Sequence, residues 1–292
     1  MTQPTPLSLI IGSLHYDIMV ETDQLPRLDE TAVGHRWFPK FGGKGGNQAV
    51  AAMPSRMVGA VGNDEFGAFL RERLDQAGVD HRGVTTLAQP SGMSVAIMNA
   101  DGDYAATIVS GANLAIDPAQ FDTPQIWQDI GILVLQNEVA PAVNLAAARG
   151  ARQRNIPVLL NAAPARPLSD DFAQLVDILV VNAIEAEMFG AAPVTDLASA
   201  KAAAATLIAG FNAVIVTAGS KGVAWATQDS APAALPAVPV AAVSAHGAGD
   251  CFTGALAKAL VRGASLAQAC ERASHAAAAH VAQKTAPPEP VA

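Results

Sequence analysis

Asp250 stands directly after a loop of small residues, Gly247-Ala248-Gly249, and before a stretch in which apolar residues recur at helical spacing. Free backbone N–H groups at the start of a helix point outward and attract anions, and glycine lets a phosphate come close. A carboxylate beside a transferring phosphoryl group can accept the proton of the attacking hydroxyl. The stretch therefore indicates a phosphate site with its own general base. An acidic residue in the first turn of a helix also occurs for stability alone.

A second glycine-rich stretch, Gly42-Gly43-Lys44-Gly45-Gly46-Asn47-Gln48, has four glycines within five residues. Such a run permits close backbone approach or unusual φ/ψ angles. Asn47 can cap the helix that follows, and Pro54 ends that helix. The stretch matches neither a Walker A loop nor a GxGxxG turn after a buried strand. Because the glycines open a helix, they favour a ligand site over a merely flexible loop.

Short apolar runs alternate with helical patterns along most of the chain, which predicts parallel βαβ units. We expect buried strands at 7–11, 56–61, 132–135, 158–160, 178–181 and 214–216, and antiparallel edge strands at 223–226 and 238–240. Polar residues follow several of these strands, namely Glu138, Asn161, Asn182 and Thr217. One edge of the sheet is therefore polar, and we expect the active site there.

Two segments break this alternation. In the segment of about 14–42, apolar and polar residues alternate irregularly. The segment of about 90–110 has the pattern of a hairpin that turns at Asp101-Gly102. We expect a single α/β domain over residues 1–292, with a doubly wound, mostly parallel sheet flanked by helices. The two segments would add a small β lid.

Composition and net charge limit the classes of partner that the protein is expected to bind. Hydrophobic residues make up 51% of the chain, charged residues 15%, and the formal net charge is -8. This charge disfavours nucleic acid and anionic membrane surfaces, and no apolar run reaches the roughly 18 residues of a membrane span. The start, Met1 to Pro6, lacks the basic residues of a secretory signal. Cys251 and Cys270 have no metal-ligand spacing and suit a reducing compartment, so we expect a cytoplasmic protein.

The two glycine-rich stretches, at this separation, resemble those of the ribokinase-like (PfkB) carbohydrate kinases. The resemblance covers nearly the whole chain, and some pieces resemble the ribokinase branch in particular. The remaining matching pieces are 12–17, 110–113, 161–165, 182–185, 217–222 and 275–279.

The resemblance implies transfer of the γ-phosphoryl group of ATP to a sugar hydroxyl with Mg²⁺ present. Asp250 would be the general base, beside an anion hole made by the Gly247-Ala248-Gly249 loop and the N–H groups of residues 248–250. The acceptor sugar would be held by Asp17, Gly42, Gly43, Lys44, Asn47 and Glu138. The nucleotide would contact Asn182, Thr217, Gly219, Ser220, Gly222 and His275. Glu185 would hold Mg²⁺ through water.

The chain also departs from the family pattern. Ser244-Ala245 stands where the family has Asp-Thr, and residues 284–287 lack an expected glycine, which weighs against activation by K⁺. His246, beside the anion hole, would touch a phosphate as a cation or fill space as a neutral ring, and we favour the neutral ring. His15 replaces an asparagine that contacts the sugar in the family, which puts ribose in doubt.

Three functions follow from these observations. The first is a sugar kinase, with a lid that closes over the sugar and often forms a dimer interface in this family. The second is a nucleoside kinase of the same fold. The third is a catalytically silent, sugar-binding regulator, against which the intact Asp250 argues. A nicotinamide-dependent dehydrogenase would need a GxGxxG turn after the first strand, which is missing.

Overall fold

The structure, a computed structural model, describes residues 6–99, 103–242 and 244–282. Within these residues the larger sheet has nine strands: β1 (Leu7–Ile11), β4 (Ser55–Gly62), β5 (Asp80–Leu87), β8 (Ile130–Gln136), β9 (Val158–Asn161), β10 (Ile178–Asn182), β11 (Ala213–Thr217), β12 (Gly222–Thr227) and β13 (Ser230–Pro236). They lie in the order β13-β12-β11-β10-β9-β8-β1-β4-β5. The strands from β5 to β11 are parallel, whereas β12 and β13 are antiparallel.

One predicted edge strand was misplaced. The second edge strand lies at Ser230–Pro236 and not at 238–240. The hairpin turns directly after β12, since Thr227 pairs with Ser230, so the returning strand begins eight residues earlier than the apolar run suggested. Its sequence is rich in alanine and proline, which have low strand propensity, and an edge strand tolerates both.

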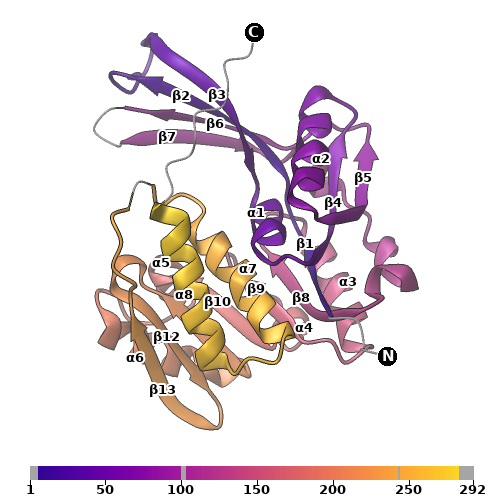
Figure 1. Cartoon of the computed structure of the whole chain (residues 1–292), viewed down its shortest axis with the longest axis vertical. Helices are drawn as coiled ribbons and strands as arrows, with labels where there is room; N and C mark the ends of the chain where they lie inside the picture. Colours follow the sequence, from indigo (N-terminus) through magenta and orange to yellow (C-terminus); the bar gives the residue numbers. More distant parts are fainter. Residues whose placement is uncertain (1–5, 100–102, 243, 283–292) are drawn as a thin grey trace.

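Helices cover both faces of the sheet (Figure 1). The α-helices are α1 (Lys44–Ala51), α2 (Glu65–Ala77), α3 (Pro141–Arg152), α4 (Asp170–Ala173), α5 (Ala183–Met188), α6 (Leu197–Leu207), α7 (Ala248–Val261) and α8 (Leu266–Ala282). Short 3-10 turns span 111–115, 118–122, 124–127, 208–210 and 219–221. Leu9 and Ile11 of β1 face the core beneath α3 to α6, whereas Ile10 faces the core beneath α1, α2, α7 and α8. This alternation confirms the expected α/β class with helices on both faces.

In the described part of the chain, a second sheet of four strands extends beyond the first. It contains β2 (His15–Thr22), β3 (Gly34–Gly42), β6 (Met93–Met98) and β7 (Tyr104–Val109), in the order β3-β2-β6-β7. Figure 1 shows it projecting at the top of the view, beyond the ends of α7 and α8. Its strands come from within the segments 14–42 and 90–110, and residues 100–102 of the predicted turn lie outside the described residues.

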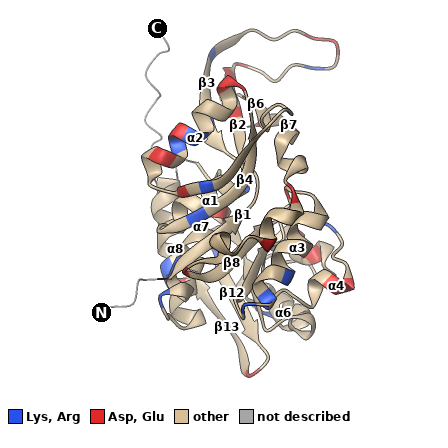
Figure 2. Cartoon of the chain, turned by 90° about the vertical axis from the view of Figure 1, so that its right-hand side faces the viewer, with Lys and Arg blue, Asp and Glu red and all other residues tan. Residues whose placement is uncertain are grey.

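Charged residues of both signs are dispersed along the chain (Figure 2). Lys and Arg lie among Asp and Glu in that view, in keeping with the net charge of -8. Of the helices in the described ranges, none combines the length and the apolar composition that crossing a membrane requires.

Candidate active site

The loop before α7 exposes backbone donors. Gly247 is the N-cap of α7 and has a φ of 80°, a left-handed conformation that glycine adopts without strain. The Ala248 N–H donates to the Ala245 carbonyl at 3.2 Å. In the described part of the chain the N–H groups of Gly249 and Asp250 have no hydrogen-bond partner. These two groups therefore remain free to bind an anion at the positive end of the helix dipole.

Asp250 lies in the first turn of α7 and is only 8% exposed. Gln48 Nε2 donates to its Oδ1 at 2.9 Å, and Asn47 Nδ2 donates to its Oδ2 at 3.3 Å. Burial raises the pKa of Asp250, as does the charge of Glu138, while Lys44 and the two amides oppose the rise. The carboxylate is thus oriented by two donors, and its raised pKa brings it nearer to the pH at which a general base works best.

The second glycine stretch places α1 against this carboxylate. Gly43 has a φ of 86°, and a Cβ there would lie 2.7 Å from the Ser13 carbonyl oxygen. The positive φ ends β3 and starts the helix at Lys44, so the prediction that Asn47 caps the helix was wrong. Asn47 instead lies inside the first turns, and its side chain is free to reach Asp250.

A buried acidic side chain lies near the start of the four-stranded sheet. Asp17, on β2, is 6% exposed and accepts a hydrogen bond of 2.5 Å from Ser94 Oγ on β6. Burial raises the pKa of Asp17 and lowers that of Lys40, which is directly opposite on β3. His15 begins β2 and is 3% exposed, and its Nε2 has no hydrogen-bond partner among the described residues.

Glu138 connects the end of β8 to the glycine stretch. Its Oε2 accepts hydrogen bonds from Ser13 Oγ and from the Lys44 N–H, the latter at 3.0 Å. Five of the predicted acceptor residues, Asp17, Gly42, Gly43, Asn47 and Glu138, thus gather around the start of α1. The sixth, Lys44, begins α1 but lines the cavity described next, so its side chain lies apart from the other five.

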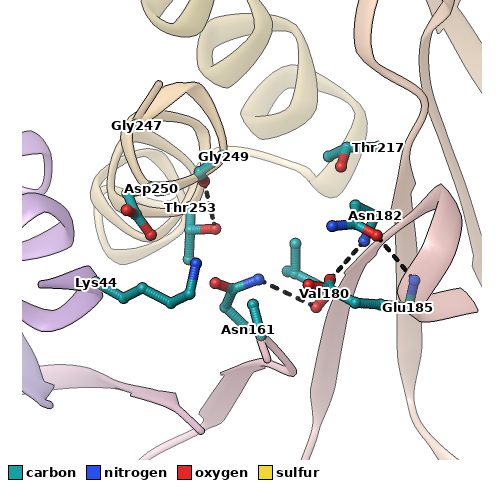
Figure 3. Close-up of a pocket in the computed structure, with 11 residues that line it drawn as sticks. Lys44, Asn161, Val180, Asn182, Glu185, Thr217, Gly247, Gly249, Asp250 and Thr253 are labelled. Carbon is teal, nitrogen blue, oxygen red and sulfur yellow. Dashed lines mark hydrogen bonds between the residues drawn. The ribbon is translucent and has the colours of Figure 1, made fainter. Parts of the chain in front are cut away.

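A cavity of about 200 Å³ lies on the other side of Asp250 (Figure 3). Its lining comprises Lys44, Asn161, Ala163, Val180, Asn182, Glu185, Thr217, Gly247, Gly249, Asp250 and Thr253. Figure 3 shows Lys44 extending toward the cavity from α1, opposite Asn182 and Glu185 at the start of α5. The structure therefore brings together seven predicted residues from four separate stretches of the sequence.

Other predicted residues lie outside this lining. Gly219, Ser220 and His275 are exposed, and Gly222 opens β12 with a φ of 125°. Burial lowers the pKa of His246, which favours the neutral form of its ring.

Asn182 and Glu185 form a reciprocal cap at the start of α5. The Asn182 N–H donates to Glu185 Oε2, and the Glu185 N–H donates to Asn182 Oδ1, each at 2.8 Å. Glu185 is 8% exposed, and burial raises its pKa. Its Oε1 has no hydrogen-bond partner in the described ranges. A carboxylate oxygen is therefore available in the cavity. Among the described residues, no group of three or more His, Cys, Asp or Glu forms a metal site. A lone carboxylate suits Mg²⁺, which keeps waters and binds substrate phosphates.

Sequence reasoning did not assign a site role to Gln48, Asn161, Thr253, Ser94 or Lys40. Helical spacing carried a usable signal for one of them, since Thr253 follows Asp250 by three residues and therefore shares its face of α7. Asn161 was expected at the polar edge of the sheet that holds the active site, but it was given no role there. Ser94 and Lys40 reach Asp17 only through the pairing of β2 with β6 and β3.

The chain is similar to known proteins over most of its length. The family model described as pfkB family carbohydrate kinase matches residues 6–290. Ribokinase from Mus musculus is 34% identical over 258 residues, covering 85% of this chain and 80% of the mouse protein. Deoxyribokinase from Salmonella typhi is 34% identical over 272 residues, covering 90% of this chain and 89% of the Salmonella protein. A solved structure of Arabidopsis thaliana ribokinase in complex with ribose and ATP superposes with a TM-score of 0.88 at 30% identity, covering 97% of this chain and 95% of that one. The chain therefore belongs to the pfkB family of carbohydrate kinases.

Proposed function

We propose that the protein is an ATP-dependent sugar kinase in which Asp250 is the general base. The observation that carries this proposal is the position of Asp250. Its buried carboxylate lies between a cavity lined by Lys44, Asn182 and Glu185 and the cluster of acceptor residues at the lid. A base placed between two binding regions suits transfer of a group from one region to the other.

In the proposed reaction, Asp250 accepts the proton of the acceptor hydroxyl as that oxygen attacks the γ-phosphorus of ATP. The new P–O bond forms to the sugar, the bond between the γ-phosphorus and the β,γ-bridging oxygen breaks, and ADP leaves. The free N–H groups of Gly249 and Asp250 stabilise negative charge on the transferring phosphoryl group, as a preorganised anion hole does. Lys44, which extends into the cavity, adds a positive charge there.

ATP would occupy the cavity side. The A. thaliana ribokinase complex contains ATP, and the cavity of this chain offers polar groups for phosphates. We propose that the nucleotide contacts Asn182, Thr217, Gly219, Ser220, Gly222 and His275. Glu185 Oε1 would hold Mg²⁺ through water, and Mg²⁺ would neutralise phosphate charge when bound.

The acceptor would occupy the lid side, held by Asp17, Gly42, Gly43, Asn47 and Glu138. We also propose that the four-stranded sheet is a lid within one domain of residues 1–292 and that it closes over the sugar to exclude water. A homodimer through one face of this sheet would cover Trp37, which is 58% exposed. A cytoplasmic location stays a prediction.

The test is ATP consumption by the purified protein with Mg²⁺ against pentoses, deoxypentoses, hexoses, sugar acids and nucleosides, with and without K⁺. We expect turnover with one class of sugar and no activation by K⁺, because Ser244 replaces the expected acidic residue and accepts the His246 N–H at 3.3 Å. Asp250→Asn should lower kcat at least about a hundredfold while sugar binding persists. Turnover confined to nucleosides would favour the nucleoside kinase. Sugar binding without any ATP consumption would overturn the proposed activity and favour a silent regulator.

A further inference from the structure

Three buried amide side chains connect Asp250 to the ends of two central strands. Gln136 Nε2, on β8, donates to Gln48 Oε1 at 2.8 Å. Gln48 Nε2 donates both to Asp250 Oδ1 at 2.9 Å and to Asn161 Oδ1 at 3.1 Å. Asn161 Nδ2 donates in turn to the Val180 carbonyl at 3.4 Å. The two glutamines are fully buried, and Asn161, 7% exposed, lines the cavity, so this chain of hydrogen bonds extends from the cavity wall into the core.

These partners fix which end of each amide faces the carboxylate. If the Gln48 amide were reversed, its oxygen would face Asp250 and its NH₂ group would face the NH₂ group of Gln136. Both contacts would then be repulsive in a site where an unmatched polar group is expensive. The reversed oxygen of Gln48 would also face Asn161 Oδ1, to which its NH₂ group donates. The Gln136 amide contacts Gly12, where a Cβ would lie only 1.8 Å from Oε1, and this oxygen has no hydrogen-bond partner among the described residues. The two acceptors, Asp250 and Asn161, therefore orient the NH₂ group of Gln48 toward the carboxylate.

We propose that Gln48 is a positioning residue for the transfer reaction: it holds Oδ1 of Asp250 so that Oδ2 faces the acceptor hydroxyl. Gln48 is fully buried, so it acts through Asp250 and not by touching either substrate. The two oxygens of Asp250 have different partners, because Oδ2 is approached at 3.3 Å by Asn47, a residue on the acceptor side. The inference rests on the proposed role of Asp250 as the general base.

Loss of the Gln48 donor has two consequences that a purely structural residue would not produce. The ionised form of Asp250 loses one charge-assisted hydrogen bond, so the carboxyl retains its proton to higher pH. The carboxyl also gains rotational freedom, so a smaller fraction of complexes has a well-aligned base. We expect Gln48→Met to lower kcat by roughly tenfold or more and to move the acid limb of the kcat/KM profile upward by about one pH unit. The KM for the acceptor should change less than about threefold, since no acceptor contact is removed.

Asn144 provides a matched control. It is also fully buried, and its Nδ2 donates to the Gln136 backbone carbonyl at 2.8 Å, but it does not contact Asp250. Asn144→Leu should lower the melting temperature as Gln48→Met does, while the acid limb stays within about 0.2 pH units of wild type. Gln48→Glu is the second variant, to be used if Gln48→Met does not fold, because glutamate keeps the shape of the glutamine side chain. A carboxyl placed 2.9 Å from Asp250 should move the acid limb upward still further.

A second readout does not depend on turnover. The free energy of unfolding of each Gln48 variant is compared with that of the double variant that also carries Asp250→Asn. The pH dependence of this difference reports the titration of Asp250 directly. If the wild type phosphorylates no acceptor, the proposed function fails, but this measurement still tests the contact. Folded Gln48 variants whose acid limb and Asp250 titration match those of wild type would overturn the positioning role. An equal kcat loss in Asn144→Leu would overturn it as well.

Discussion

Gly42 and Asp17 lie so close together that a Cβ at Gly42 would come within 1.9 Å of Asp17 Oδ2. Gly42 ends β3 and pairs with His15 at the start of β2, two residues before Asp17. The opposite oxygen of Asp17 is already engaged by Ser94 Oγ. The absence of a side chain at Gly42 therefore sets the orientation of the Asp17 carboxylate toward the acceptor side.

Gly42→Ala should displace the Asp17 carboxylate and raise the KM for the acceptor by about tenfold or more, as expected when one charge-assisted hydrogen bond is lost. The KM for ATP should change less than twofold, because the cavity lies on the other side of Asp250. Steady-state kinetics with each substrate varied in turn measures both values. Gly210→Ala is the control, since nothing lies within 4 Å of a Cβ there. An unchanged acceptor KM in folded Gly42→Ala would remove Asp17 from the acceptor site.

Asp250→Asn should be more stable than wild type at pH 7. Burial raises the native pKa of Asp250, so the native state binds more protons than the unfolded state between the ordinary value of about 3.9 and the raised value. Asp250 therefore destabilises the fold at neutral pH, and the advantage of the asparagine variant should shrink as the pH falls toward 4. Melting temperatures of both proteins between pH 4 and pH 8 test this sign.

Asp64→Asn supplies a control of opposite sign. Burial opposes ionisation of Asp64, but the hydrogen bonds from Ser91 and Gly67 outweigh it and lower the pKa. Asp64→Asn should therefore be less stable than wild type at neutral pH, and this deficit should shrink as the pH falls through the lowered native pKa. A destabilised Asp250→Asn at pH 7 would show that its hydrogen bonds outweigh its burial.

The parts of the fold that could be predicted from the sequence are those in which local pattern and burial agree. The central strands, such as 178–181, are continuous apolar runs because both faces are buried, and the sequence identified them to within one or two residues. The edge strand β5 went unnoticed, because Asp80–Leu87 mixes charged and apolar residues without clear alternation. At the sheet edges, pairing with a neighbour and not local pattern determines the strand.

The same division holds for the site. Asp250 and the loop before it could be identified because glycine followed by an acidic residue at a helix start is a local signal. Gln48 could not, because its role depends on Gln136 and Asn161, which lie 88 and 113 residues away. Such a role depends on which strand ends lie side by side in the sheet, and no single stretch of sequence encodes that.

Asp80→Asn should destabilise the fold by about 2 kcal/mol, because it removes the carboxylate partner of the largely buried Arg56. Hydrogen bonds from Arg82 and Arg56 hold the pKa of Asp80 well below its usual value. Its contribution is therefore present at neutral pH and should be lost as the pH falls below about 4. Urea unfolding at pH 7 and at decreasing pH measures the effect. Arg82→Gln should leave the midpoint nearly unchanged, since Arg82 is exposed; an equal loss there would contradict the assignment to Arg56.

Glu185→Gln should raise the Mg²⁺ concentration for half-maximal activity by about tenfold, the lower end of the effect of losing an outer-shell metal contact. A glutamine oxygen can still accept the Asn182 N–H and preserve the reciprocal cap, so the melting temperature should change little. Titration of activity with Mg²⁺ at saturating ATP and acceptor measures the change. Glu187→Gln, on the same helix but exposed, is the matched control and should behave as wild type. If Glu185→Gln kept the wild-type Mg²⁺ dependence, Glu185 would be a helix cap and nothing more.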